Sequence, residues 1–99
     1  MAKPFAMGNW HVAEGNEQEF VQRWSEFLGW ARETQESLIG ASLIRNEQDP
    51  RHFISFSEWK DAGARGVWKN SEGFMERFSA CRELCENFSG ADYEREVEV

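Results

Sequence analysis

The sequence predicts one α+β domain, spanning residues 1–99, with its elements in the order β-α-β-β-α-β. Three observations lead to this prediction. Segments in which large apolar residues occupy alternate positions, as in strands, lie at both ends of the chain and twice in its middle. Two longer segments repeat apolar residues at the spacing of amphipathic helices. This order is typical of the ferredoxin-like fold, in which one four-stranded antiparallel sheet carries both helices on one face.

The N-terminal third contains a predicted strand followed by a helix. Residues from Phe5 to Ala13 alternate as a strand. After this strand, we expect the Asn16 side chain to accept hydrogen bonds from the backbone N–H groups of the first helical turn. The helix ends near Thr34 and Gln35. Its apolar stripe consists of Phe20, Val21, Trp24, Phe27, Leu28 and Ala31.

An antiparallel hairpin is predicted in the middle of the chain. Its first strand runs from Leu38 to Glu47, and its second strand runs from Arg51 to Lys60. The segment between the strands is rich in residues that favour turns. The second strand therefore returns directly beside the first.

Two helical segments and a last strand are predicted in the C-terminal third. Asp61 can cap a short helix from Ala62 to about Lys69, which two glycines weaken. The helix restarts at Asn70-Ser71 and ends at Ser89-Gly90. Its apolar stripe consists of Phe74, Phe78, Cys81, Cys85 and Phe88. The last strand is predicted from Tyr93 to Val99, with one face entirely acidic.

The strand from His52 to Trp59 carries large apolar groups on both of its faces. The first strand does the same, so either of its two alternating sets of residues can face the helices. Two helices cover only one face of the sheet. We therefore expect the other face to pack against a second copy of the chain in a twofold homodimer. The alternative is a monomer with one solvated sheet face, which antiparallel sheets tolerate.

Charge and composition argue against several classes of function. Eighteen acidic residues against eleven Lys and Arg give a net charge of −7. Because the basic residues are scattered, neither nucleic acid nor an anionic membrane is an expected partner. No segment is apolar for long enough to span a membrane, and the first residues lack the apolar core of a signal peptide, so we expect a cytoplasmic protein. Cys81 and Cys85 have no nearby His or further Cys, which predicts two buried thiols rather than a zinc site, with a redox pair as the alternative.

Three segments of the chain carry a family resemblance. They are Ala13-Glu-Gly-Asn-Glu-Gln-Glu-Phe20, Phe56-Ser-Glu-Trp-Lys60 and Val67-Trp-Lys-Asn-Ser-Glu-Gly-Phe74. In this order and spacing they resemble the antibiotic biosynthesis monooxygenase domain, over nearly the whole chain. The resemblance implies a dimeric α/β barrel, in which two ferredoxin-like subunits pack sheet to sheet. It also implies a pocket between each sheet and its own helices.

The family contains several activities. Some members oxidise polyketide phenols to quinones with O₂ and without a metal or flavin, others degrade haem, and others lack a known activity. Asn9 and Trp68 match an Asn and a Trp that haem-degrading members use. Their His ligand falls at or next to Phe78, where the nearest substitute ligand is Cys81, one turn away. Trp59 matches a tryptophan that lies near the substrate in quinone-forming members.

The residues alone leave two interpretations open for each candidate. The Asn9 amide could bind a substrate or O₂, or it could bind a backbone carbonyl. His11 lies on the same strand face and could act as a base or lie at the surface. Trp68 and Trp59 could be pocket walls or structural aromatics.

From the residues and the resemblance together, we predict a monooxygenase for a small aromatic, polyketide- or quinol-like substrate. Asn9 would orient the substrate or O₂, His11 would act as the base, and Trp68 would complete the catalytic set. The residues expected to contact the substrate are Trp59, Phe74 and Phe78. No cofactor is expected, and haem is the alternative ligand. The other alternative is a non-catalytic, ligand-binding dimer.

Overall fold

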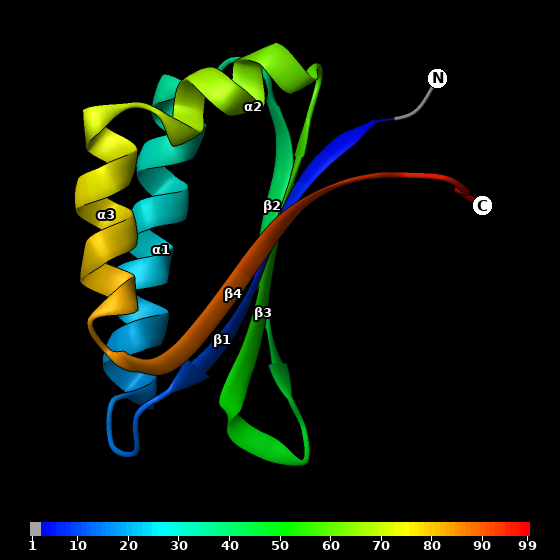
Figure 1. Ribbon diagram of the computed structural model, residues 1–99. Helices are drawn as coiled ribbons and strands as arrows, with labels where there is room; N and C mark the ends of the chain where they lie inside the picture. The colour runs from blue at the N-terminus through cyan, green and yellow to red at the C-terminus, as the bar shows by residue number, and fades with distance from the viewer. Residues whose placement is uncertain (1–2) are drawn as a thin grey trace.

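The computed structural model describes residues 3–99 and confirms the predicted α+β fold. Its elements are β1 (Pro4–Val12), α1 (Glu17–Thr34), β2 (Leu38–Asn46), β3 (Asp49–Trp59), α2 (Ala62–Lys69), α3 (Glu72–Arg82) and β4 (Cys85–Glu94). The strands form one antiparallel sheet in the order β2-β3-β1-β4. The helices cover one face of this sheet and leave the other face open (Figure 1). None of the helices in the described part of the chain is long and apolar enough to cross a membrane.

The first helix forms where its apolar stripe predicts it, but its N-terminus is not capped as expected. The Asn16 side chain accepts no hydrogen bond from the helix. Instead, its amide Nδ2 donates to the backbone oxygen of Leu84, 3.3 Å away. The neighbouring Ala13 nitrogen donates to the same oxygen at 2.9 Å. Asn16 therefore ties the β1–α1 turn to the segment that enters β4, a long-range contact that no local pattern signals.

Each of the two later helices is capped by the side chain of the residue directly before it. The Asp61 side chain accepts a hydrogen bond from the Ala64 nitrogen at 2.7 Å and begins α2. Ser71 Oγ accepts from the Phe74 nitrogen at 3.2 Å and begins α3. Each cap satisfies a backbone donor that has no partner within the helix. The predicted break between the two helices is confirmed at Asn70 and Ser71.

The C-terminal third corrects two predictions. The last helix ends at Arg82 rather than continuing to Phe88, and the last strand begins at Cys85 rather than at Tyr93. Residues 95–99, predicted as strand, lie outside β4. The physical reason is that β1 needs a partner on its second edge. The segment from Cys85 to Glu94 supplies one along the whole of β1, and the backbone pairing outweighs a helical apolar pattern.

The two faces of the sheet differ in burial, and this decides which alternating sets face the helices. The buried set on β1 and β3 consists of Ala6, Gly8, Trp10, Val12, Phe53, Ser55, Ser57 and Trp59. The opposite surface, here called the open face, consists on these strands of Phe5, Met7, Asn9, His11, His52, Ile54, Phe56 and Glu58. The side of the sheet that the helices cover therefore carries large aromatic rings, with smaller side chains between these rings.

Trp10 lies at the centre of the covered side. Its indole packs against Phe20 and Trp24 of α1, with ring centroids 5.5 Å away in each case. It also contacts Phe78 of α3 at 5.4 Å and Phe88 of β4 at 4.2 Å. One side chain thus joins β1, β4 and two helices, and its 2% exposure marks it as part of the hydrophobic core.

Candidate functional site: an aromatic pocket under the helices

A cavity of about 400 Å³ lies between the sheet and the helices. Residues from β1, β3, β4 and all three helices line it, and its surface is mostly apolar. This volume is within the range of pockets that hold small organic molecules. The chain therefore keeps an open space where a domain of this size would normally fill its core.

The floor of the pocket is made of small residues on the sheet. They are Ala6 and Gly8 of β1, Ser55 and Ser57 of β3, and Gly90 of β4. Gly8 lies opposite both Ser55 and Gly90 in the strand register. Three neighbouring strands thus carry small side chains at the same level of the sheet, and this is why the space is not filled.

The walls of the pocket are aromatic rings from all three helices. Trp24 and Phe27 of α1 stack with ring centroids 4.8 Å apart. Phe74 and Phe78 of α3 stack at 5.6 Å, and Trp68 of α2 packs edge-on against Phe74 at 4.7 Å. Rings that contact one another hold their positions, so the walls are suited to a flat aromatic ligand.

Hydrogen bonds separate the buried tryptophans into two groups. Trp10 Nε1 donates to Ser55 Oγ at 3.0 Å, and Trp59 Nε1 donates to Ser57 Oγ at 2.9 Å. The indole nitrogens of Trp24 and Trp68 are buried and have no hydrogen-bond acceptor within residues 3–99. Both of these latter rings line the pocket.

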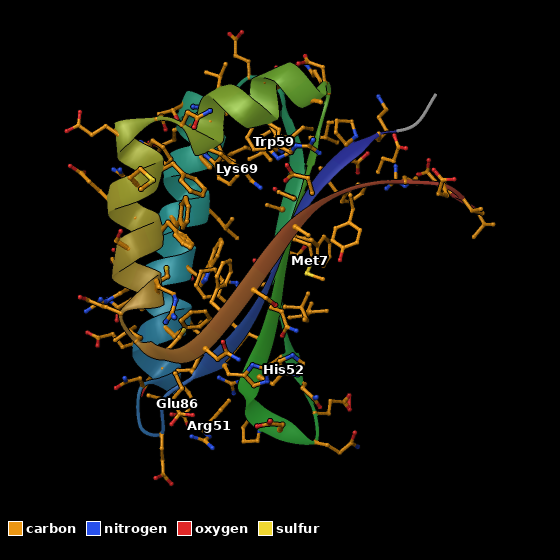
Figure 2. All side chains as sticks on the ribbon, in the orientation of Figure 1. Met7, Arg51, His52, Trp59, Lys69 and Glu86 are labelled. Carbon is orange, nitrogen blue, oxygen red and sulfur yellow. The ribbon has the colours of Figure 1, made fainter. Side chains whose placement is uncertain are left out.

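An ion pair lies at the rim of the pocket. Lys69, at the end of α2, forms an ion pair with Asp92 of β4, and Arg65 approaches the same carboxylate at 3.7 Å. Figure 2 shows Lys69 and Trp59 close beneath α2, whereas Met7 projects from the other side of the sheet. Lys69 is the charged residue among those that line the cavity in the described chain.

The structure brings together three of the six predicted site residues. Trp68, Phe74 and Phe78 all line the pocket. Trp59 does not line it, although the resemblance placed it near the substrate. Its ring lies behind Trp68, with centroids 4.7 Å apart, and it is completely buried. Trp59 therefore supports the wall and holds Ser57 rather than forming the surface itself.

Asn9 and His11 lie on the open face, so the structure does not place them in the same pocket as Trp68. Strand alternation turns both side chains away from Trp10 and the helices. Asn9 Oδ1 contacts His52 Nε2 at 2.6 Å, and the His11 and His52 rings stack at 4.7 Å. The predicted roles of Asn9 and His11 in catalysis have no support from the geometry of this pocket.

Neither histidine of the described chain lines the pocket, so the pocket lacks the imidazole that the iron of haem would bind. Both histidines are on the open face, and Phe78 occupies the position where the resemblance expects the iron-binding side chain. Burial raises the pKa of the Cys81 thiol to about 12, which opposes formation of the thiolate that iron would bind. Within residues 3–99, no cluster of three or more His, Cys, Asp or Glu side chains is arranged to hold a metal ion.

The residues missed by sequence reasoning are those of the floor. Ser55 and Ser57 lie two apart on β3 between Phe53 and Trp59, and Gly8 interrupts a strand that is otherwise well suited to packing. Small residues at alternate positions, flanked by rings on the same face, are a sequence signal for a hollow. The sequence shows this signal once it is known which face of β1 and β3 is buried under the helices.

The comparisons with known proteins agree with this architecture. The structure of SnoaB, a cofactor-independent oxygenase from Streptomyces nogalater, superposes with a TM-score of 0.89 over 100% of this chain and 98% of that one, at 15% identity. A conserved protein from Methanosarcina mazei Go1 gives 0.82 over 94% and 92%, at 21% identity. An antibiotic biosynthesis monooxygenase gives 0.79 over 97% and 99%, at 14% identity. At these identities the likenesses establish the fold.

No curated protein matches the sequence. The sequence profile of one family, described as antibiotic biosynthesis monooxygenase, matches residues 5–83. This range includes β1 from Phe5 onward, the three helices and the β2–β3 hairpin, and so every element that lines the pocket except β4. The chain therefore belongs to the antibiotic biosynthesis monooxygenase family.

Proposed function

We propose that this protein is a monooxygenase that binds a small, flat aromatic phenol in the pocket and inserts one atom of O₂ into it without a metal or flavin. The observation that carries the proposal is the ring-lined cavity of about 400 Å³ in a member of a monooxygenase family. SnoaB, which shares the fold, is described as a cofactor-independent oxygenase. These findings support the reaction class, and the substrate is part of the proposal.

The proposed reaction converts a phenol with a free ring position into a quinone. One oxygen atom of O₂ becomes the new carbonyl, and the other leaves as water with two hydrogens from the substrate. The ring supplies all four electrons. The pocket would contribute a dry, preorganised site in which Trp24, Phe27, Phe74 and Phe78 hold the ring plane. Lys69 at the rim would favour the phenolate, the form from which an electron passes most readily to O₂.

The test uses 1,5-dihydroxynaphthalene, which would give a coloured hydroxynaphthoquinone with one equivalent each of O₂ consumed and water formed. We expect oxygen uptake and quinone absorbance above the rate without protein. With ¹⁸O₂, one labelled atom should appear in the quinone and one in water. Incorporation of no labelled atom in the product would contradict monooxygenation.

A matched pair of variants connects activity to the pocket. Trp68→Phe retains an aromatic wall but removes a buried N–H donor, so we expect slower turnover. Trp30→Phe is the control, because Trp30 is a half-buried ring that packs beneath Arg77 and does not line the cavity. Equal rates in both variants would argue against catalysis in this pocket. Oxygen uptake at background for all proteins would favour the non-catalytic alternative, and a Soret shift on titration with haem would favour the haem alternative.

We also propose that two copies of the chain associate through their open faces. Three apolar side chains on this face are well exposed, with Ile44 and Tyr93 at 52% and Phe56 at 36%. Glu58 is neutralised by Arg95, whose two terminal nitrogens donate to its carboxylate at 2.9 and 3.1 Å. A second copy of the same face would therefore meet apolar surface beside a Glu58 carboxylate that is already paired.

The path of the C-terminal residues supports the same partner. After Glu94 the chain leaves the sheet and runs to the side opposite the helices (Figure 1). Val97 is 80% exposed in this segment. The segment extends into the space that a second subunit on the open face would occupy, and a partner sheet is one surface that would bury such side chains.

A further inference from the structure

The two serines of the pocket floor are held in an unusual hydrogen-bonding state. Each hydroxyl oxygen accepts an indole N–H, Ser55 from Trp10 and Ser57 from Trp59. Both serines are 6% exposed, and both line the pocket. A serine hydroxyl is at once an acceptor and a donor. In each case the protein uses the acceptor function of the oxygen.

The donor function of the two hydroxyls is left for another group. Within residues 3–99, neither Ser55 nor Ser57 donates a hydrogen bond to a carbonyl, carboxylate or other side chain. The indole hydrogen occupies one side of each oxygen, so the hydroxyl hydrogen turns away from it. A buried donor without an acceptor costs free energy, and a ligand in the pocket can remove that cost.

The rest of the pocket reinforces this donor character. The buried N–H groups of Trp24 and Trp68 have no acceptor in the described chain. Lys69 at the rim has donors only, and the carboxylate of Asp92 is already paired with it. The remaining lining side chains are hydrocarbons, aromatic rings and thioethers. The lining side chains thus include the two serine hydroxyls and the Lys69 ammonium as donors, and almost no free acceptor.

We infer that Ser55 and Ser57 are the specificity-determining residues of the pocket and donate hydrogen bonds to acceptor oxygens of the ligand. The inference rests on the proposed function, because it concerns the same pocket. The two serines lie two residues apart on one strand, which places them roughly 7 Å apart. The ligand class is therefore an aromatic ring system with carbonyl or phenolate oxygens along one edge. Trp10 and Trp59 are positioning residues, because they hold the hydroxyls.

The test measures how much more tightly the pocket binds a molecule with a carbonyl group than a similar molecule without one. The probes are 1-tetralone and tetralin, two molecules of nearly the same shape of which only the first has an acceptor oxygen. Their dissociation constants are measured by calorimetry for the wild-type chain, Ser55→Ala, Ser57→Ala and the double variant. Ser89→Ala is the matched control, since Ser89 is an exposed strand serine on β4 outside the pocket.

We expect the double variant to lose about tenfold in affinity for 1-tetralone relative to tetralin, and Ser89→Ala to keep the wild-type ratio. Because tetralin is measured in the same protein, its affinity reports whether the pocket is intact, even where an unpaired indole lowers stability. If the double variant does not fold, the same ratio of affinities is measured for the two single variants. An unchanged ratio with tetralin still bound would overturn the inference and leave the proposed function standing. Failure of both probes to bind the wild-type chain would overturn both.

Discussion

Gly8→Ala tests the link between the pocket floor and the stability of the fold. A Cβ atom on Gly8 would lie 2.6 Å from Trp10 Nε1, 2.8 Å from Ser55 Oγ and 3.1 Å from the Phe88 ring. The first two atoms are the partners of one buried hydrogen bond. Neither can move freely, because Trp10 is packed among the rings of α1, α3 and β4. The added methyl group must therefore disturb this bond or displace the strand.

The expected cost follows from three contributions. Overpacking a core of this kind costs about 1–3 kcal/mol. Weakening the Trp10–Ser55 hydrogen bond adds about 0.5–1.5 kcal/mol. Alanine has less conformational freedom than glycine in the unfolded chain, and this offsets the loss of stability by about 0.4–1 kcal/mol. We therefore expect a net loss of about 2 kcal/mol in the free energy of unfolding, or roughly 8–16 °C in Tm for a chain of this length.

The measurement is urea unfolding at a fixed protein concentration, followed by circular dichroism, so that any self-association is the same for all samples. Gly29→Ala is the control. Gly29 lies on the exposed side of α1 with no atom within 4 Å of the added Cβ, and alanine there should stabilise the helix by up to about 1 kcal/mol. The two substitutions are chemically the same and should have opposite signs. A Gly8→Ala protein as stable as the wild type would refute the close packing described for the floor.

Three further outcomes are expected. Phe56→Asp places a charge on the open face and should convert the proposed dimer to single chains, as measured by light scattering; a variant that stays dimeric would place the interface elsewhere. Burial raises the pKa of the Cys81 thiol from 9.0 to about 12, so the unfolded chain loses this proton first as the pH rises, and the free energy of unfolding should fall between about pH 9 and pH 12. Cys81→Ala should show a shallower fall in urea titrations over this range, and an equal fall would contradict the assignment. Asn9→Ala should leave the affinity of the pocket for 1-tetralone unchanged, and a tenfold loss would restore the role predicted for Asn9 from the family resemblance.

Patterns among residues close in sequence were sufficient to predict most of the fold. The stripe that includes Phe20 and Phe27 predicted α1, and the turn-rich segment between the two middle strands predicted the hairpin, whose turn the structure places at residues 47–48. Asp61 was correctly predicted as a helix cap because its partner lies only three residues away. These features depend on interactions between residues that are close in sequence, which is why one sequence sufficed to predict them.

The errors arose where distant segments decide the structure. The apolar residues Cys85 and Phe88 continue the helical spacing of α3, yet both belong to β4. Phe88 pairs with Trp10 across the sheet, and that pairing is invisible in a local window. The same limitation affected the site. Trp68 and the α3 rings could be placed in a pocket, whereas the side on which Asn9 lies depended on which face of β1 the helices cover.

The alternation of side chains along β1 and β3 has an evolutionary consequence. Substitutions at positions 6, 8, 55 and 57 alter the shape and chemistry of the pocket, whereas substitutions at positions 9 and 54 alter the opposite surface of the sheet. Each strand therefore carries two interleaved sets of residues that selection can change separately. A lineage with this scaffold can therefore change the pocket while the opposite surface stays the same, or change that surface while the pocket stays the same.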